Sequence, residues 1–237
     1  MPVILSIETS ASTCSVAIAN DGRNISVKEN HVDKSHASIL NVLIREAVAE
    51  SGIPMGKIDA VAVSKGPGSY TGLRIGVSSA KGICYALNKP LIAVDTLKIM
   101  AIMASQVFLQ KLDEELLICP MIDARRDEVY TALFNSRTEK LNETTAVIIS
   151  PDFFGDIDPE IAILCCGSGA PKCNEIVKRK NVVFSDSIFP SAEFMCQPAL
   201  DLYSKACFED VAYFEPYYLK DFIATVPKNK IPGIIAR

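Results

Sequence analysis

Residues that bind catalytic metals are scarce in this 237-residue sequence. Its two histidines, His31 and His36, lie five positions apart, so they cannot form the i, i+4 pair that binds a metal from one helix. The sequence has no HExxH motif, and no acid or cysteine is spaced to complete a site around either histidine. We therefore expect surface or helix-capping histidines and no bound metal.

Long apolar runs and a secretion signal are also lacking. No apolar run approaches the roughly 20 residues of a membrane-spanning helix. Residues 1–10 reach Glu8 without a basic region or a cleavage site, which argues against a signal peptide. We expect a cytoplasmic protein that makes no membrane contact.

Clusters of positive charge are missing as well. The formal net charge is -4, and the 24 lysines and arginines are dispersed among 28 acidic residues. Binding of nucleic acid needs clustered cations that neutralise phosphates. Any contact with tRNA or another RNA is therefore expected to be indirect or minor and to need a partner.

The eight cysteines include no CxxC pair, which removes the usual signature of zinc knuckles and thioredoxin-like sites. Most of them lie within apolar runs of a large chain that shows no secretion signal. We expect buried free thiols.

A glycine-rich segment, GPGSYTGLRIG at residues 66–76, is the most informative motif. It is neither a P-loop, because no lysine follows Gly72, nor a dinucleotide fingerprint. Its glycines let a ligand approach the backbone, and the following helix N-terminus offers donors to an anion. Arg74 is unusual in a first helical turn, so it either contacts an acid or helps to hold an anion. The candidate phosphate-binding residues are Ser10, Gly68, Ser69, Thr71, Gly72 and Arg74. A tight turn that packs the helix on its sheet is an equally good interpretation.

Residues 1–104 are predicted to form an N-terminal α/β lobe. Strands are expected at 3–8, 14–20 and 23–29, with Asp21-Gly22 as a hairpin turn, and further strands at 59–64 and 91–94. Helices are expected from Ser35 to about 51, over 73–88 and from 96 onward. The later strands join through helices, as parallel strands must.

Residues 105–237 are predicted to form a second, degenerate α/β lobe that repeats the first. Strands at 116–123, 128–134 and 161–166 and a helix at 170–178 follow the same pattern of acidic-tipped strand and glycine turn. A helix near 191–210 is expected to pack back on the first lobe, and the basic tail beyond Asp221 is expected to be irregular. Asp123 and Asp127 form either a carboxylate pair or a solvated turn.

Two helices of the first lobe carry a candidate partner interface. Gly72, Gly76, Ala80 and Cys84 form one i+4 row, a smooth ridge that another helix can approach closely. The helix over 35–51 is apolar over more than one narrow stripe and includes Leu40, Leu43 and Ala47. Burial within the monomer is the alternative explanation.

Several segments resemble the TsaB family, formerly described as glycoprotease-like: ILSIETSASTCSVAI, the run from 61 to 87, DARRDEVYTALF and YFEPYYLKDF. The resemblance spans nearly the whole chain, and the run from 61 to 87 is shared with the catalytic TsaD family. TsaD-like proteins carry two metal-binding histidines four residues apart, at positions that correspond here to Thr96 and Met100. Glu8 stands where the family commonly has aspartate.

This resemblance implies a two-lobed fold like that of acetate and sugar kinases, Hsp70 and actin, which is ribonuclease H-like, without metal chemistry. It implies a non-catalytic scaffold with no catalytic residues and no cofactor beyond weak ATP or ADP binding. The implied partners are a TsaD-like catalytic subunit and a TsaE-like ATPase, and in isolation a second copy of the chain. The complex transfers threonylcarbamoyl from its adenylate to the tRNA adenosine next to the anticodon.

Two other functions remain open from the residues. An ATP-dependent phosphotransferase of the same fold would rely on Glu8, Asp123 and the glycine turns. A metallopeptidase, which the older family description suggests, lacks the ligands that it needs.

Overall fold

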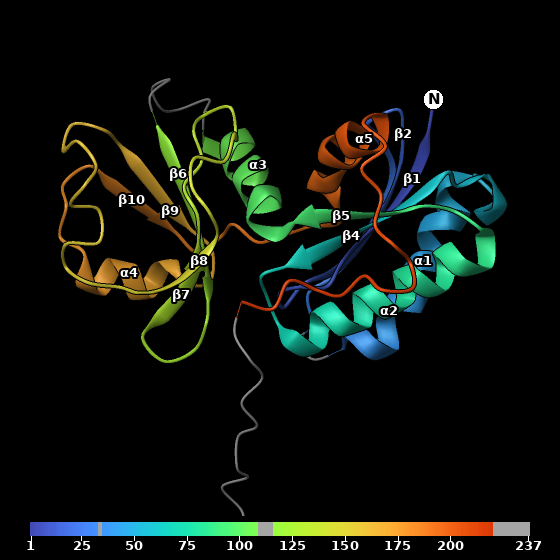
Figure 1. Ribbon diagram of the computed structural model, residues 1–237, viewed down its shortest axis with the longest axis horizontal. Helices are drawn as coiled ribbons and strands as arrows, with labels where there is room; N and C mark the ends of the chain where they lie inside the picture. Colours follow the sequence, from blue (N-terminus) through green and yellow to red (C-terminus); the bar gives the residue numbers. More distant parts are fainter. Residues whose placement is uncertain (33–34, 109–115, 220–237) are drawn as a thin grey trace, which may run out of the picture.

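Two five-stranded mixed sheets form the two lobes of the molecule (Figure 1). The computed structural model describes residues 1–32, 35–108 and 116–219. The basic tail beyond Asp221 therefore lies outside the described residues. Within them, no helix combines the length and the apolar character needed to span a membrane. The two-lobed α/β fold class is confirmed.

The first sheet has the strand order β3-β2-β1-β4-β5. Its strands are β1 (Val3–Glu8), β2 (Cys14–Asn20), β3 (Arg23–Asn30), β4 (Ala60–Gly66) and β5 (Leu91–Asp95). The first three form an antiparallel meander, and β4 and β5 join parallel to β1. Because β4 and β5 need crossovers, the chain returns through helices, as the sequence predicted.

Both faces of β1, β2, β4 and β5 are buried, which explains why these strands are largely apolar, whereas the edge strand β3 is polar and mostly exposed or half-buried. α1 (His36–Ser51) and α2 (Tyr70–Leu87) cover one face, and a short 3-10 helix, η1 (Met55–Lys57), precedes β4. The 3-10 helix η2 (Ala192–Met195) and α5 (Cys196–Ser204) cover the other face. Helices from both the N-terminal and the C-terminal part of the chain therefore cover the first sheet.

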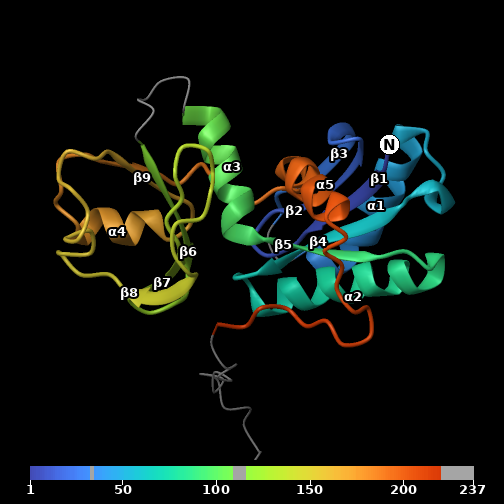
Figure 2. The ribbon, with the colours of Figure 1, turned by 45° about the horizontal axis from the view of Figure 1, so that its top comes forward.

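The second sheet has the order β10-β9-β6-β7-β8. Its elements are β6 (Leu117–Asp123), β7 (Glu128–Thr131), β8 (Thr145–Ile148), β9 (Ile163–Cys166), β10 (Val182–Ser185) and the helix α4 (Ala170–Ile176). α3 (Thr96–Phe108) stands between the lobes (Figure 2). Ile99 belongs to the core of the first lobe, whereas Leu97 and Met100 belong to that of the second. The predicted boundary at 104 and 105 stays a prediction, since α3 serves both cores.

Three expectations about elements need correction. α2 begins at Tyr70, three residues early, because the Ser69 hydroxyl caps it by accepting a hydrogen bond from Gly72 N (3.3 Å). The single helix expected over 191–210 is η2 followed by α5, and it ends at Ser204, where Ala206 takes a left-handed conformation (φ 50°). The edge strands β8 and β10 were not expected.

The cysteines fit the prediction of buried thiols, since six of the eight are buried and all are free. The histidines fit it in part. His31 is exposed, but His36 is buried, and its Nε2 lies 2.9 Å from the Ala11 carbonyl oxygen. His36 therefore ties the start of α1 to the turn between β1 and β2.

Candidate functional site

The turn that follows β1 lies directly against the glycine turn that follows β4. Ser69 N donates to the Ser10 carbonyl oxygen at 2.7 Å, and Thr9 Oγ1 donates to the Gly72 carbonyl oxygen at 2.8 Å. Both Thr9 and Ser10 are buried. These contacts join the two segments in which a phosphate-binding site was sought.

Three glycines make this close approach possible. A Cβ on Gly72 would lie less than 3.0 Å from the Thr9 carbonyl oxygen, and one on Gly68 less than 3.0 Å from that of Ser10. A Cβ on Gly76 would lie equally close to Thr9 Oγ1. The space that these glycines leave is therefore filled by the backbone and hydroxyl of the chain itself, which is the packing role that the sequence left open.

Arg74 was expected either to contact an acid or to help hold an anion; the contacts that the structure describes for it are with Tyr70, and the anion-binding role stays a prediction. Its Nη1 donates to the Tyr70 hydroxyl at 2.8 Å, and its guanidinium carbon lies 5.4 Å from the centroid of the Tyr70 ring. Because α2 begins at Tyr70, Arg74 lies beyond the first turn of the helix, where the helix dipole no longer disfavours a cation, and the ring face adds a favourable contact. The neighbouring Thr71 is exposed.

Glu8, at the end of β1, is fully buried. Burial in the protein interior raises the pKa of its carboxyl from 4.5 to about 7, and the hydrogen bond from the Ser10 backbone opposes this shift. Oε1 accepts that bond from Ser10 N at 2.5 Å, whereas Oε2 has no hydrogen-bond partner among the described residues. With a pKa of about 7, this carboxyl still holds a proton about half of the time at neutral pH, and its burial keeps it from presenting its charge to a ligand.

The predicted partner interface is wrong in the residues that it names. Gly72, Gly76, Ala80 and Cys84 are all buried, because this row of α2 faces the sheet of its own lobe. Leu40, Leu43 and Ala47 of α1 lie in the same core. The small residues of this row let α2 pack closely against Thr9, so the element that they contact belongs to this same chain.

The opposite side of α2 is the side that remains free to meet another molecule. A Cβ on Gly82 would meet nothing within 4 Å, although a glycine inside a helix costs about 1 kcal/mol relative to alanine. One turn away, Tyr85 is 87% exposed. Beside them lies an open, mainly apolar hollow of about 640 Å³, lined by Lys81, Gly82, Tyr85, Asp210, Val211 and Ala212. We call Ser78, Gly82 and Tyr85 with this hollow the outer α2 face.

The C-terminal strap, residues 205–219, runs along α2 and forms one border of that face (Figures 1 and 2). Lys81 Nζ donates to the Ala212 and Phe214 carbonyl oxygens, both at 3.0 Å. Tyr217 N donates to the Lys65 carbonyl oxygen at 2.7 Å, next to Gly66. Part of this strap belongs to the segment YFEPYYLKDF, which resembles the TsaB family, but the sequence did not predict its contacts. These hydrogen bonds use backbone groups of the strap, which side-chain patterns do not reveal.

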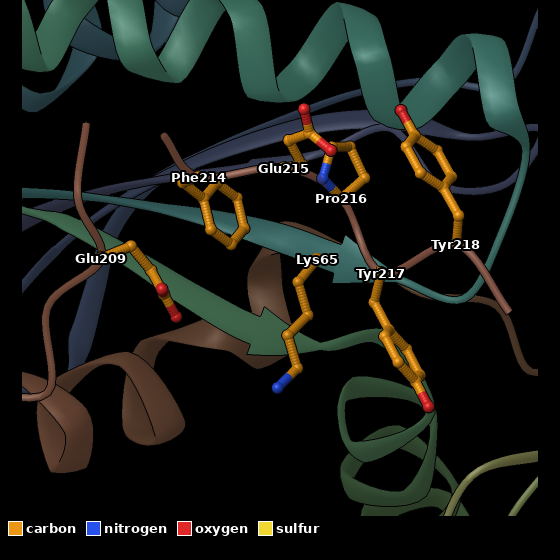
Figure 3. A pocket seen from close by; sticks show the side chains of 7 residues that line it. All are labelled: Lys65, Glu209, Phe214, Glu215, Pro216, Tyr217 and Tyr218. Carbon is orange, nitrogen blue, oxygen red and sulfur yellow. The ribbon is translucent and has the colours of Figure 1, made fainter. Parts of the chain in front are cut away.

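A second hollow, of about 450 Å³, opens between the strap and the end of β4. Figure 3 shows Tyr218 directed toward α2, while the Lys65 and Tyr217 side chains point away from it. The Tyr218 ring packs on Tyr70, with the two centroids 5.0 Å apart. The strap thereby closes over the glycine turn from outside.

The positions that correspond to metal-binding histidines are filled with core residues. Thr96 and Met100 are 0% and 1% exposed, and Met100 belongs to the core of the second lobe. Gly167 (φ 101°) has the Met100 methyl so near that a Cβ there would overlap it. Across the described ranges, no group of three or more histidine, cysteine or acidic side chains is arranged to hold a metal.

In the second lobe, Asp123 does not pair with Asp127. Asp123 Oδ1 instead forms an ion pair with Lys172 Nζ of α4 at 2.6 Å, and Asp123 N donates to Ser168 Oγ at 3.1 Å. Asp127 is exposed. The segment is therefore a solvated turn, which is one of the two alternatives that the sequence allowed.

Comparison with known proteins gives a consistent picture. The family model for tRNA N6-adenosine threonylcarbamoyltransferase, TsaD, matches residues 27–224. The tRNA threonylcarbamoyladenosine biosynthesis protein TsaB of Escherichia coli is 28% identical over 97% of this chain and 98% of its own length. The protein of the same name from Haemophilus influenzae is 27% identical, over 97% of both chains. A crystal structure from Pseudomonas aeruginosa, of a protein with similarity to peptidase YeaZ, superposes with a TM-score of 0.79 at 26% identity, over 93% of this chain and 100% of that one.

Proposed function

The chain belongs to the tRNA N6-adenosine threonylcarbamoyltransferase (TsaD) family, and we propose that it is a non-catalytic member that supports a TsaD-like catalytic subunit. Its relatives from E. coli and H. influenzae, both named TsaB, match it over nearly their full lengths. The reaction served is the formation of threonylcarbamoyladenosine on tRNA, which is the process in their names.

The buried state of Thr96 and Met100 is the observation that carries the non-catalytic part of this proposal. A thioether is a poor ligand for a hard cation, and the Met100 methyl is packed against Gly167. A metal at this place would need the core of the second lobe to open. The resemblance therefore extends to the fold of a TsaD-like protein but not to its metal centre.

Nucleotide binding is proposed to play no part in the work of this subunit. The Thr9 and Ser10 backbone occupies the room beside Gly68 and Gly72, and the nearest acid, Glu8, is enclosed and has a raised pKa. These features leave weak ATP or ADP binding at an open hollow as the remaining possibility for a cofactor. They also count against an ATP-dependent phosphotransferase.

The outer α2 face is proposed as the surface that meets the catalytic subunit. A helix glycine whose Cβ would meet no described residue weakens the free protein, but it lets the backbone of a partner approach closely. Exposed tyrosine beside an apolar hollow is the composition of binding hot spots. Without a partner, a second copy of the chain would use the same face. A TsaE-like ATPase would join the assembly, in the cytoplasm where tRNA is modified.

Substitutions at Gly82 test this surface. Gly82→Arg is expected to leave the fold intact, since the site is open, and to weaken binding of a TsaD-like protein by about 3 kcal/mol, because a charge is desolvated at the contact. Gly82→Ala is the matched control. It should stabilise the free chain by up to about 1 kcal/mol and weaken the complex much less than Gly82→Arg does, because it adds one methyl group and no charge. Calorimetric binding and urea unfolding measure the two effects. Unchanged affinity of Gly82→Arg would place the interface elsewhere.

A further inference from the structure

The turn between β6 and β7 places two arginines in an unfavourable backbone conformation. Arg125 and Arg126 have φ angles of 65° and 53°, both left-handed. Glu128 N donates to the Arg125 carbonyl oxygen at 3.4 Å, so Arg126 and Asp127 are the central residues of this turn, and a positive φ at the first of them favours glycine. Side chains other than glycine, asparagine and aspartate are strained in this region. Strained backbone conformations often occur at functional sites, so these two side chains are candidates for a functional role.

Neighbouring groups hold this turn in place. The Asp123 carboxylate accepts a hydrogen bond from Arg125 N at 2.6 Å and forms its ion pair with Lys172. Lys172 Nζ also donates to the Arg126 carbonyl oxygen, so that α4 is fastened to the turn. The charge of Asp123 is thereby balanced by Lys172 and does not offset the guanidinium groups.

The two guanidinium groups are available to bind another molecule. Both arginines are exposed, and among residues 1–32, 35–108 and 116–219 neither lies within 4 Å of a carboxylate oxygen. Two further acids lie beside the arginines: Asp127, which is exposed, and Glu128, which is half-buried and takes part in an interaction of its own. The turn lies at the lower end of the second lobe in Figure 1, the same end at which α2 begins.

We propose that Arg125 and Arg126 form an RNA-contacting tip that binds two backbone phosphates of the tRNA held by the complex. The guanidinium fork fits phosphate oxygens in a bidentate manner, and adjacent residues of a tight turn present two forks together. This inference rests on the proposed function, which makes tRNA the substrate. Since the chain carries a net charge of -4, two contacts supplement those of the catalytic subunit and do not replace them.

The variant Arg125→Asn/Arg126→Gly tests the tip in the assembled complex with a TsaD-like protein. Binding of an unmodified tRNA transcript is measured across salt concentrations. Loss of two phosphate contacts should lower the slope of log K against log salt by about 1.4 to 1.8 and weaken binding roughly 10- to 30-fold near 0.15 M salt. The melting temperature of the free chain should rise by about 2–4 °C, because asparagine and glycine adopt a left-handed conformation with less strain than arginine does. If the turn had only a structural role, the variant would not combine a higher melting temperature with weaker binding of tRNA.

Arg23→Ala/Lys57→Ala is the matched control, since it removes two exposed cations from the first lobe. The control should retain the slope. The proposal is overturned if the salt slope falls equally in both variants, or if the slope of the turn variant is unchanged. Size exclusion separates this failure from failure of the proposed function, because the proposed function predicts that every variant forms a complex with the TsaD-like protein. If the turn variant loses the TsaD-like protein itself, the tip binds an acidic protein surface and the RNA assignment is wrong.

Discussion

Gly72→Ala is expected to destabilise the fold by about 3 kcal/mol, at the upper end of the usual cost of overpacking. The new Cβ would overlap the Thr9 carbonyl oxygen, which belongs to backbone and cannot turn away as a flexible side chain does. The Thr9 hydroxyl, bonded to the Gly72 carbonyl oxygen, would be displaced as well. Higher helix propensity recovers about 1 kcal/mol of the loss at most.

Urea unfolding at constant m-value measures this effect. Gly82→Ala is the control in the same helix, and it should move stability in the opposite direction. A Gly72→Ala chain within about 0.5 kcal/mol of the parent would show that the two turns do not pack as described, and would reopen a phosphate-binding role for the glycine turn.

Glu8→Gln is expected to remove a large pH dependence of stability. The pKa of Glu8 rises from 4.5 to about 7 on folding, so between these values the folded state binds more protons than the unfolded state. The stability that the protonated carboxyl contributes is complete below about pH 4.5 and is lost as pH rises through about 7. The loss amounts to about 3 kcal/mol by pH 8.

Glutamine keeps the shape and the acceptor for Ser10 N but cannot ionise. The variant should therefore match the parent near pH 4 and exceed its stability by about 3 kcal/mol at pH 8. Cys14, the titratable neighbour of Glu8, stays neutral over this range because its own pKa is raised to about 12. Parallel stability profiles of parent and variant from pH 4 to 8 would show that Glu8 is not held as an enclosed acid.

Much of the fold follows from local pattern. Four strands of the first sheet, β1, β2, β4 and β5, are largely apolar on both faces, and Asp21-Gly22 and Gly52 mark a turn and a helix end that the structure contains. β8 and β10 escaped prediction because they are short edge strands with few buried side chains. Recognition of the TsaB family is confirmed by relatives matched over nearly their whole length.

The candidate site was harder to predict for a physical reason. A row of small residues shows that something approaches a helix closely, but it does not show what approaches. In α2 the neighbour is Thr9, 63 residues before Gly72 in the chain, and that pairing depends on tertiary structure. Gly82 lies outside that row and was not singled out in the sequence; its open surroundings became visible in the structure.

The modification of tRNA by separated and recombined subunits tests the central claim most directly. Unmodified tRNA and threonylcarbamoyl-adenylate are incubated with this chain, with a TsaD-like protein from the same genome, or with both, and threonylcarbamoyladenosine is quantified by mass spectrometry. The buried Thr96 and Met100 predict no product from this chain alone and more product from the pair than from the TsaD-like protein alone. Product from this chain alone would contradict a non-catalytic role.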